Sequence, residues 1–287
     1  MANAPFHRAA IVGTGLIGGS FALALRKRFP HISLVGYGRA ESLERARGRG
    51  AIDEGASDLA GAVRGADLVY IALPIGATIE ALPAIAKAAE PGSLVTDACS
   101  TKTAICRAAK EQFRGGAHFL GGHPMAGKER SGVENADADL FRGAPYVLMG
   151  PEETAGERAK EFTGMVRAMG AHPVWTDPET HDWAAGIVSH LPQLLSVALA
   201  NVVQNETDET GLPLALAGQG LSDMLRLAGS PYEVWRDILL TNTENVSRAL
   251  DRLAQTVDHL RTRLASKDIE QEFQTANELY KALRKQS

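Results

Sequence analysis

The chain has 287 residues, of which 45% are hydrophobic and 22% are charged, and its formal net charge is −4. This length favours two domains, and the composition is ordinary for a globular protein. The small negative charge gives no electrostatic reason to expect nucleic acid or a membrane surface as a partner.

Cysteine usage and hydropathy indicate an intracellular protein. Two cysteines, Cys99 and Cys106, cannot form a disulfide framework, and no group of Cys, His or carboxylates has the spacing of a metal site. No apolar run reaches the roughly 18 residues that a membrane-spanning helix needs. The first residues, Met1 to Arg8, lack the apolar segment of a signal peptide. We therefore expect a cytoplasmic protein with no metal, no nucleic-acid partner and no membrane partner.

The first 176 residues alternate between short apolar runs and helix-like stretches. Strands that are apolar on both faces and separated by helices predict a parallel sheet covered on both sides. The expected strands are Ala9–Gly13, Ser33–Tyr37, Leu68–Leu73, Leu94–Asp97, His118–Gly121, Pro145–Met149 and His172–Trp175. The expected helices are Leu16–Arg28, Ile75–Ala89, Thr101–Phe113 and Glu153–Met169. This pattern predicts an α/β, Rossmann-type doubly wound domain over residues 1–176.

Helical periodicity dominates residues 177–287. Asp177 and Pro178 suit the cap and the first position of a helix. Long amphipathic helices are expected over Leu239–Leu264 and Ile269–Leu283. Helices with long apolar faces can bury them against a second copy of the chain. We expect an all-helical substrate and dimerisation domain, and a homodimer formed through the C-terminal helices.

A dinucleotide-binding turn is predicted near the start of the chain. Gly13-Thr14-Gly15-Leu16-Ile17-Gly18 follows the first strand and opens the first helix. In this motif the first Gly makes the tight turn, the second lets the backbone approach a pyrophosphate, and the third allows close helix–strand packing. Leu73 and Pro74, at the end of a neighbouring strand, are expected to line the same cofactor. The alternative is a Gly-rich turn without a ligand.

The end of the second strand bears on the choice between NAD and NADP. Gly38 stands where an acidic residue would bind the ribose 2′-hydroxyl of NAD, and Arg39 follows it. A missing acid beside a guanidinium favours a 2′-phosphate, hence NADP over NAD. The alternatives are that Arg39 stacks on the adenine or points to solvent.

Four further segments resemble a known family. They are, in chain order, Asp97-Ala98-Cys99-Ser100-Thr101-Lys102, then Gly121-Gly122-His123-Pro124-Met125-Ala126-Gly127, then His181-Asp182-Trp183 running to Ser189-His190-Leu191-Pro192, and Trp235-Arg236-Asp237-Ile238. With the opening glycine motif they make nearly the whole chain similar to the prephenate/arogenate dehydrogenase family. The resemblance implies oxidative decarboxylation of a cyclohexadienyl substrate with hydride transfer to NAD(P), giving tyrosine from arogenate or 4-hydroxyphenylpyruvate from prephenate.

This chemistry needs a base, a group that positions the ring hydroxyl and a clamp for a carboxylate. His123 is the expected base, because imidazole titrates near neutral pH and Gly121-Gly122 before it would permit close approach of a ligand. The resemblance implies that Ser100 hydrogen-bonds the same hydroxyl and approaches the nicotinamide. The plainer alternatives are a loop histidine packed by Pro124 and a serine that caps a helix.

The helix after Pro178 is expected to form a wall of the substrate site. Gly186, His190 and Gln193 recur at helical spacing and share one face, and Pro192 should kink the helix beside them. His181 is nine positions before His190, so on a regular helix it would face the opposite way, and we expect it to be structural.

The resemblance implies that Arg236 clamps the substrate carboxylate, with Arg226 as a second candidate; the alternative for Arg236 is a surface ion pair with Asp237 or Glu233. Prephenate-preferring members usually have histidine where this chain has Gln193, which favours arogenate or acceptance of both substrates.

Two other functions remain open at this point. A hydroxyacid dehydrogenase or imine reductase would also join a Rossmann domain to helices, but would place Lys or Asp where this chain has His190 and Gln193. A non-catalytic dinucleotide-binding sensor would have no need of Ser100, His123 and Arg236 together.

Overall fold

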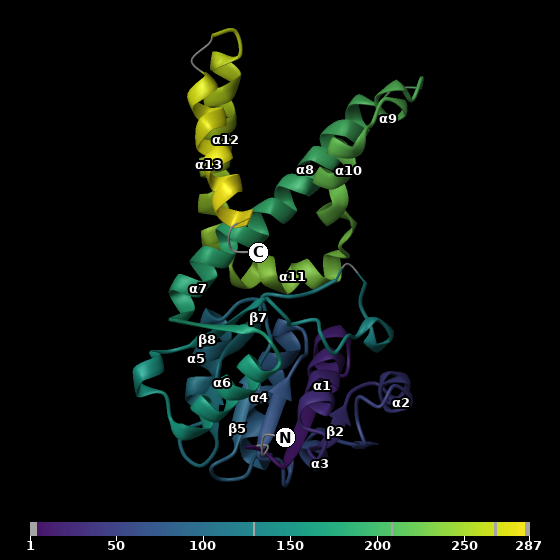
Figure 1. Cartoon of the computed structure of the whole chain (residues 1–287), viewed down its shortest axis with the longest axis vertical. Coiled ribbons are helices and arrows are strands. Elements are labelled where there is room, and N and C mark those ends of the chain that lie inside the picture. Colours follow the sequence, from purple (N-terminus) through teal and green to yellow (C-terminus); the bar gives the residue numbers. More distant parts are fainter. Residues whose placement is uncertain (1–4, 129, 208, 267–268, 285–287) are drawn as a thin grey trace.

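The computed structural model describes residues 5–128, 130–207, 209–266 and 269–284. The first half of Met1–Arg8, the stretch without a signal-peptide pattern, lies outside these residues. The α/β part contains the strands, and the helical part projects from one side of it (Figure 1). The C-terminal helices extend as two arms, one formed by α8 with α10 and the other by α12 with α13 (Figure 1).

The α/β part is the predicted Rossmann-type fold. Six parallel strands lie in the order β3-β2-β1-β4-β5-β6, which reverses direction between β1 and β4. Their bounds are β1 Arg8–Val12, β2 Ser33–Tyr37, β3 Glu54–Gly55, β4 Leu68–Ile71, β5 Leu94–Asp97 and β6 His118–Leu120. The helices of this part are α1 Leu16–Arg28, α2 Ala40–Gly48, α3 Leu59–Val63, α4 Ile75–Ala88, α5 Thr103–Gln112 and α6 Glu157–Ala168. The prediction of an α/β doubly wound sheet is confirmed.

Alternate residues of the central strand β1 pack into two separate hydrophobic cores, one on each face of the sheet. Ala9 and Ile11 of β1 pack with side chains from α1 and α6. Ala10 and Val12 pack on the other face, with side chains from α3, α4 and α5. Burial on both faces explains why the strand reads as a continuous apolar run.

The prediction that all the strands join one parallel sheet is wrong for the last two. Pro145–Met149 (β8) and His172–Thr176 (β9) form a second, three-stranded sheet with β7, Gly122–Pro124. In that sheet β7 runs antiparallel to β8, whereas β8 and β9 are parallel. Period and hydrophobicity mark a strand but do not identify its neighbour, so the second sheet was missed.

Several helix limits also differ from those expected. The short elements α2, β3 and α3 were not expected from the sequence. The helix expected over Thr101–Phe113 begins at Thr103, and the one expected over Glu153–Met169 begins at Glu157 after a short 3₁₀ turn.

The helical part begins where it was expected, at Pro178, with the Asp177 side chain accepting from the amide of Thr180. The chain continues through α7 to a π-helical turn, Gly186–His190, and directly into α8. At the position of the predicted kink the helix contains this π turn, immediately before Pro192 in the first turn of α8. The helices are α7 Pro178–Ala185, α8 Leu191–Glu206, α9 Leu212–Ala215, α10 Gln219–Leu225, α11 Tyr232–Thr241, α12 Thr243–Arg263 and α13 Glu270–Arg284.

The helix expected from Leu239 is interrupted. α11 ends at Thr241 and α12 begins at Thr243, with Asn242 between them. The side chain of Asn242 is buried and hydrogen-bonded to α7 and to the π turn. These tertiary bonds replace a regular helical path at this position.

The helical part exposes much apolar surface. Among the described residues, every large apolar side chain that is exposed lies in this part except Val174. The continuous helix Pro178–Glu206 is, by length and composition alone, apolar enough to cross a membrane, which corrects the expectation that no such segment exists. The same helix carries five buried polar side chains, which would be costly in lipid: His181, Asp182, His190, Gln193 and Ser196.

Candidate active site

The glycine motif has two glycines that packing requires and one that it does not. Gly13 has a φ of +100°, and a Cβ there would lie 2.4 Å from the carbonyl oxygen of Ala72. A Cβ on Gly18 would lie 1.9 Å from the carbonyl oxygen of Gly13. At Gly15 an added Cβ would meet no protein atom within 4 Å. This free approach to the backbone at Gly15 is what a pyrophosphate requires.

The start of α1 is suited to an anion. Helix α1 begins at Leu16, and Ile17 is its second residue. Gly15, at the N-cap, has no side chain that could bond the first amides, and no acidic residue lies in the first turn. The first main-chain N–H groups of the helix are therefore available to a phosphate. Leu73 and Pro74 lie at the end of the adjacent strand β4, across the point where the strand order reverses. The residues present fit a dinucleotide.

The ribose end of this site contains no carboxylate from β2. A Cβ on Gly38 would lie 3.3 Å from the hydroxyl of Thr14, and that hydroxyl is paired with the Ser42 hydroxyl at 2.9 Å. Arg39 is the cap residue of α2, and its side chain is exposed. A guanidinium thus stands beside the end of β2 with no hydrogen bond to another described residue.

Ser100 lies between β5 and α5 and is partly exposed. The cap alternative for Ser100 is not supported, because α5 begins three residues later. The amides at the start of α5 are instead bound by the Asp182 carboxylate, which accepts from Lys102 N at 2.7 Å and from Thr103 N at 2.9 Å. The side chain of Ser100 is left for another partner.

His123 is held in place by a buried ion pair. Lys102 and Asp97 are fully buried and paired, and the ammonium also donates to the carbonyl oxygen of Gly122 at 2.7 Å. The Asp97 carboxylate accepts from the amide of Gly122 at 3.1 Å. Both main-chain groups of the residue before His123 are therefore fixed to the end of β5, at the carboxyl edge of the main sheet.

The two glycines before His123 serve internal packing. A Cβ on Gly121 would lie 2.7 Å from a Met149 side-chain atom, and one on Gly122 would lie 2.7 Å from the carbonyl oxygen of Asp97. The expectation that these glycines leave room for a ligand is therefore wrong, because atoms of the chain itself occupy that space.

His123 contacts a residue that was expected to be structural. Nδ1 of His123 lies 2.9 Å from Nε2 of His181, and Nδ1 of His181 lies 2.8 Å from the Asp182 carboxylate. All three side chains are buried. The expectation that His181 faces away from the site assumed a regular helix between His181 and His190, whereas the π turn changes the rotation per residue there.

The face of the helix that carries Gly186, His190 and Gln193 is buried, as expected. The ring of His190 packs edge-on against Trp235, with 5.9 Å between the ring centroids. The Gln193 amide nitrogen donates to the carbonyl oxygen of Leu227 at 2.9 Å, while its oxygen is buried with no partner among the described residues.

The two candidate arginines lie on different elements. Arg236, on α11, is exposed and its Nε donates to the Asp237 carboxylate at 2.9 Å. The other oxygen of Asp237 accepts from the amide of Gly76 at 3.0 Å, which fixes α11 against the start of α4. The ion pair named as the alternative for Arg236 is thus present. Arg226 begins the 3₁₀ turn Arg226–Gly229, which packs on α8.

Burial keeps His123 and His190 neutral. Desolvation, then His181, Lys102 and His190, lower the pKa of His123 well below its usual value. Desolvation lowers the pKa of His190 to about 4. For Asp182, burial acts to raise the pKa, but hydrogen bonds from His181 and from the amides of Thr103 and Lys102 outweigh it and the pKa is lowered. Asp182 is thus anionic, whereas His123 and His190 are neutral.

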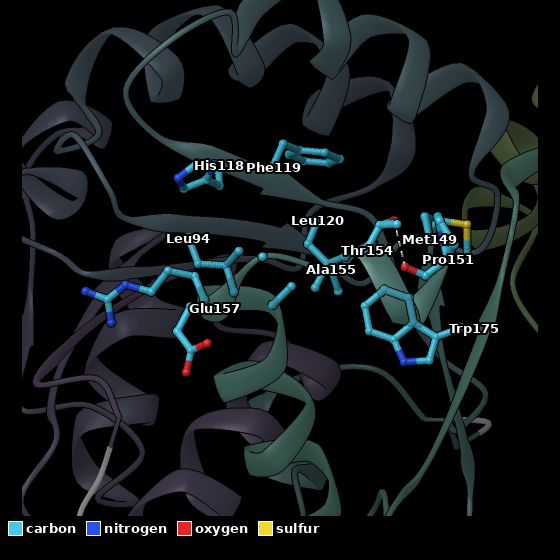
Figure 2. A pocket seen from close by; sticks show the side chains of 14 residues that line it. Leu94, His118, Phe119, Leu120, Met149, Pro151, Thr154, Ala155, Glu157 and Trp175 are labelled. Carbon is cyan, nitrogen blue, oxygen red and sulfur yellow. Dashed lines mark hydrogen bonds between the residues drawn. The ribbon is translucent and has the colours of Figure 1, made fainter.

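A separate cavity of about 340 Å³ lies between β6, the end of β8 and the start of α6 (Figure 2). Leu120, Met149 and Trp175 line it, together with Glu157 and Arg158. None of the residues predicted for cofactor or substrate lines this cavity, so it is not part of the candidate site.

Sequence comparison identifies the family. The family model described as the prephenate dehydrogenase nucleotide-binding domain matches residues 21–175, and the one described as the prephenate dehydrogenase dimerization domain matches residues 177–283. A prephenate dehydrogenase of Lactococcus lactis is 34% identical over 278 residues, which cover 95% of this chain and 76% of that protein.

Solved structures of the same family are similar to this chain over nearly its whole length. The prephenate dehydrogenase of Aquifex aeolicus, in complex with hydroxyphenyl propionate and NAD+, is 28% identical and superposes with a TM-score of 0.87 over 98% of each chain. The arogenate dehydrogenase of Synechocystis is 30% identical, with a TM-score of 0.79 over 98% of this chain and all of that one. Both domain matches and the whole-chain similarity lead to one conclusion: the chain belongs to the prephenate dehydrogenase family.

Proposed function

We propose that this chain oxidatively decarboxylates arogenate, prephenate or both, with a hydride passing from the ring to NAD(P). The observation that carries the proposal is the state of His123. Its Nδ1 is engaged by His181, and its Nε2 has no hydrogen-bond partner among the described residues. A buried, neutral imidazole with one free nitrogen is suited to accept the proton of a ring hydroxyl.

The roles of the residues follow from the chemistry. The oxidised nicotinamide, when bound, supplies the hydride acceptor. Nε2 of His123 takes the hydroxyl proton as the ring carbon is oxidised, and returns it to the phenol oxygen after carbon dioxide has left. Ser100 orients the same hydroxyl. Because aromatisation supplies the driving force, orientation and this proton transfer are the main tasks of the protein.

Arogenate is the favoured substrate, with acceptance of both as the alternative. The unpartnered amide oxygen of buried Gln193 could accept a hydrogen bond from the ammonium group of arogenate. An unsatisfied buried acceptor costs about 1–3 kcal/mol, so such a donor would be favourable. Gln193→His should shift the ratio of kcat/KM values toward prephenate, and an unchanged ratio would remove Gln193 from the specificity site.

NADP is the favoured cofactor. Gly38 removes the carboxylate that would repel a 2′-phosphate, and Arg39 is exposed beside it. Arg39→Ala should raise the KM for NADP by about tenfold or more, as expected for a charge-assisted hydrogen bond, and change the KM for NAD little. Equal effects on both cofactors would favour the stacking alternative.

Arg236 is the favoured carboxylate clamp. Its Nε is held by Asp237, which leaves the two terminal nitrogens for a ligand, and Asp237 is fixed to the start of α4 beside Pro74. Arg236→Lys should raise the substrate KM by about 10- to 100-fold, because a bidentate contact is lost. Arg226→Lys is the matched comparison, and a larger effect there would transfer the role to Arg226.

We also propose a division between a cofactor domain, 1–176, and a substrate and dimerisation domain, 177–287, and a homodimer formed through the latter. The exposed apolar side chains of α8–α13 and the description of the matching family model support the dimer. Sedimentation should give twice the chain mass of 30.5 kDa. A monomer at micromolar concentration would contradict it. The free thiols of Cys99 and Cys106 are compatible with a cytoplasmic location.

The decisive experiment measures initial rates at 340 nm for prephenate and arogenate, each with NAD and with NADP. Turnover with at least one pair supports the proposed reaction, and the fastest pair sets substrate and cofactor preference. His123→Asn should abolish turnover while leaving cofactor affinity nearly unchanged. Absence of turnover with all four pairs, while cofactor still binds, would favour a binding protein without this activity.

A further inference from the structure

We propose that His181 and Asp182 are positioning residues that fix the tautomer of His123, with the proton on Nδ1 and the lone pair on Nε2. Only the catalytic consequence rests on the proposed function. The tautomer itself can be measured on the protein without substrate, so the two proposals can fail separately.

The starting point is the Asp182 carboxylate, whose orientation is set by the main chain. It accepts from the amides of Lys102 and Thr103 at 2.7 and 2.9 Å, at the first turn of α5. Its third contact, at 2.8 Å, is Nδ1 of His181. An ionised carboxylate can only accept hydrogen bonds, so Nδ1 of His181 must carry a proton.

The next contact passes this constraint to His123. With its proton on Nδ1, neutral His181 has a lone pair on Nε2, which lies 2.9 Å from Nδ1 of His123. His123 must then donate from Nδ1, which leaves Nε2 unprotonated. Free imidazole side chains have no such constraint. The chain from Asp182 therefore selects the tautomer in which Nε2 can act as a base.

The competing arrangement protonates both nitrogens of His181. His123 would then accept at Nδ1 and carry its proton on Nε2, where it could not take a proton from substrate. That arrangement buries a second cation near the Lys102 ammonium. Lys102 is already paired with Asp97, and Asp182 already accepts from two amides, so less negative charge remains to stabilise another cation.

The same contacts matter when His123 becomes protonated during turnover. The groups that face His123 from neighbouring elements are the Lys102 ammonium, His190 and His181. Lys102 opposes a new positive charge, whereas His190 is neutral. The Nδ1–H of a protonated His123 donates to His181, which is itself hydrogen-bonded to anionic Asp182. These contacts therefore stabilise the transient imidazolium in a site that is otherwise unfavourable to charge.

The direct test is nitrogen-15 NMR of histidine-labelled protein near pH 7.5, with His123 and His181 assigned by the loss of their signals in His123→Asn and His181→Gln. We expect both rings to show protonated Nδ1 and unprotonated Nε2. A protonated Nε2 on His123 would overturn the proposal, whether or not the protein turns over any substrate.

The kinetic test compares His181→Leu with His181→Gln. Leucine removes the acceptor, whereas the glutamine oxygen can occupy the position of Nε2. We expect His181→Leu to lower kcat by about 10²- to 10⁴-fold, as found when a catalytic histidine loses its orienting partner, with KM changed less than about threefold. His181→Gln should recover most of the loss and retain the tautomer. His172→Gln, at an exposed position on β9, is the control.

Two results would refute the positioning role: a kcat within about threefold of wild type for His181→Leu, or a lower kcat with the His123 tautomer unchanged. If His181→Leu does not fold, His181→Gln and the wild-type NMR spectrum still test the positioning role of His181. If the wild-type protein turns over neither prephenate nor arogenate, the proposed reaction is wrong, and the NMR result stands alone.

Discussion

The side-chain nitrogen of Asn242 lies 3.1 Å from Nδ1 of His190 and 2.7 Å from the main-chain carbonyl oxygen of Asp182. Asn245 donates to the Asn242 oxygen at 2.8 Å, so the amide can have only this orientation. Asn242 therefore donates to His190, whose proton must be on Nε2. His190 is then a hydrogen-bond donor, whereas His123, by the argument above, is an acceptor.

Asn242→Leu should destabilise the protein by about 1–3 kcal/mol, because it leaves a buried carbonyl oxygen and a ring nitrogen without a donor. Urea denaturation at a fixed protein concentration measures the change. Asn205→Leu, at an exposed position on α8, is the control and should change the free energy of unfolding much less. Equal losses for the two variants would mean that the bonds of Asn242 contribute little.

Lys102→Met should be more damaging, by about 3–5 kcal/mol, because it leaves the Asp97 carboxylate buried without its cation. Adding Asp97→Asn to the same chain removes the unpaired charge and should recover part of the loss. Chemical denaturation of the two variants and of wild type gives the comparison. A double variant as unstable as Lys102→Met would show that the charge is not the cause.

The fold was predictable to the extent that it depends on local pattern. The glycine motif, the fully apolar strands and the Asp177-Pro178 start each determine a local structure, and each was found as expected. The pairing of β8 and β9 with β7 was not predictable in this way. It depends on which edge lies nearest after the chain has folded, and the same apolar alternation fits either sheet.

The candidate site was recognisable from the sequence where its residues stand in segments that resemble the family, and less so where a residue only contacts another candidate residue. His123 and Ser100 stand in recognisable segments beside strand ends. The facing of His181 was predicted wrongly, because it was calculated for a regular helix and the π turn was not foreseen. The roles of Lys102, Asp182 and Asn242 were also missed, although the first two stand within the quoted segments. Each of them also has a partner that is 20 to 80 residues away in the chain.

Stability should decrease on acidification through the buried histidines. The pKa of His190 is lowered from 6.5 to about 4 in the folded state. The unfolded chain therefore binds the proton first. The contribution of His190 is complete above pH 6.5 and is lost progressively between pH 6.5 and about 4, amounting to about 3 kcal/mol at most. His123 acts in the same direction.

Thermal or urea unfolding between pH 7.5 and 4.5 tests this. His190→Asn retains an acceptor for Asn242 but cannot titrate, so its stability should fall less steeply with decreasing pH than that of wild type. His172→Asn, at an exposed position, should follow wild type. Parallel curves for wild type and His190→Asn would contradict the lowered pKa.

The glycine motif allows folding and cofactor binding to be separated by two alanine substitutions. A methyl group on Gly18 would meet the carbonyl oxygen of Gly13 at 1.9 Å, so Gly18→Ala must displace α1 from β1 and should lower the melting temperature by several degrees. A methyl group on Gly15 meets no protein atom within 4 Å, so Gly15→Ala should melt close to wild type.

If the pyrophosphate approaches the backbone there, Gly15→Ala should nevertheless weaken cofactor binding by about tenfold or more, because the methyl group occupies the ligand's space. Cofactor fluorescence titration and a melting curve on the same samples provide both readouts. Unchanged affinity in Gly15→Ala would mean that the dinucleotide does not contact this turn, and the glycine would then need another explanation.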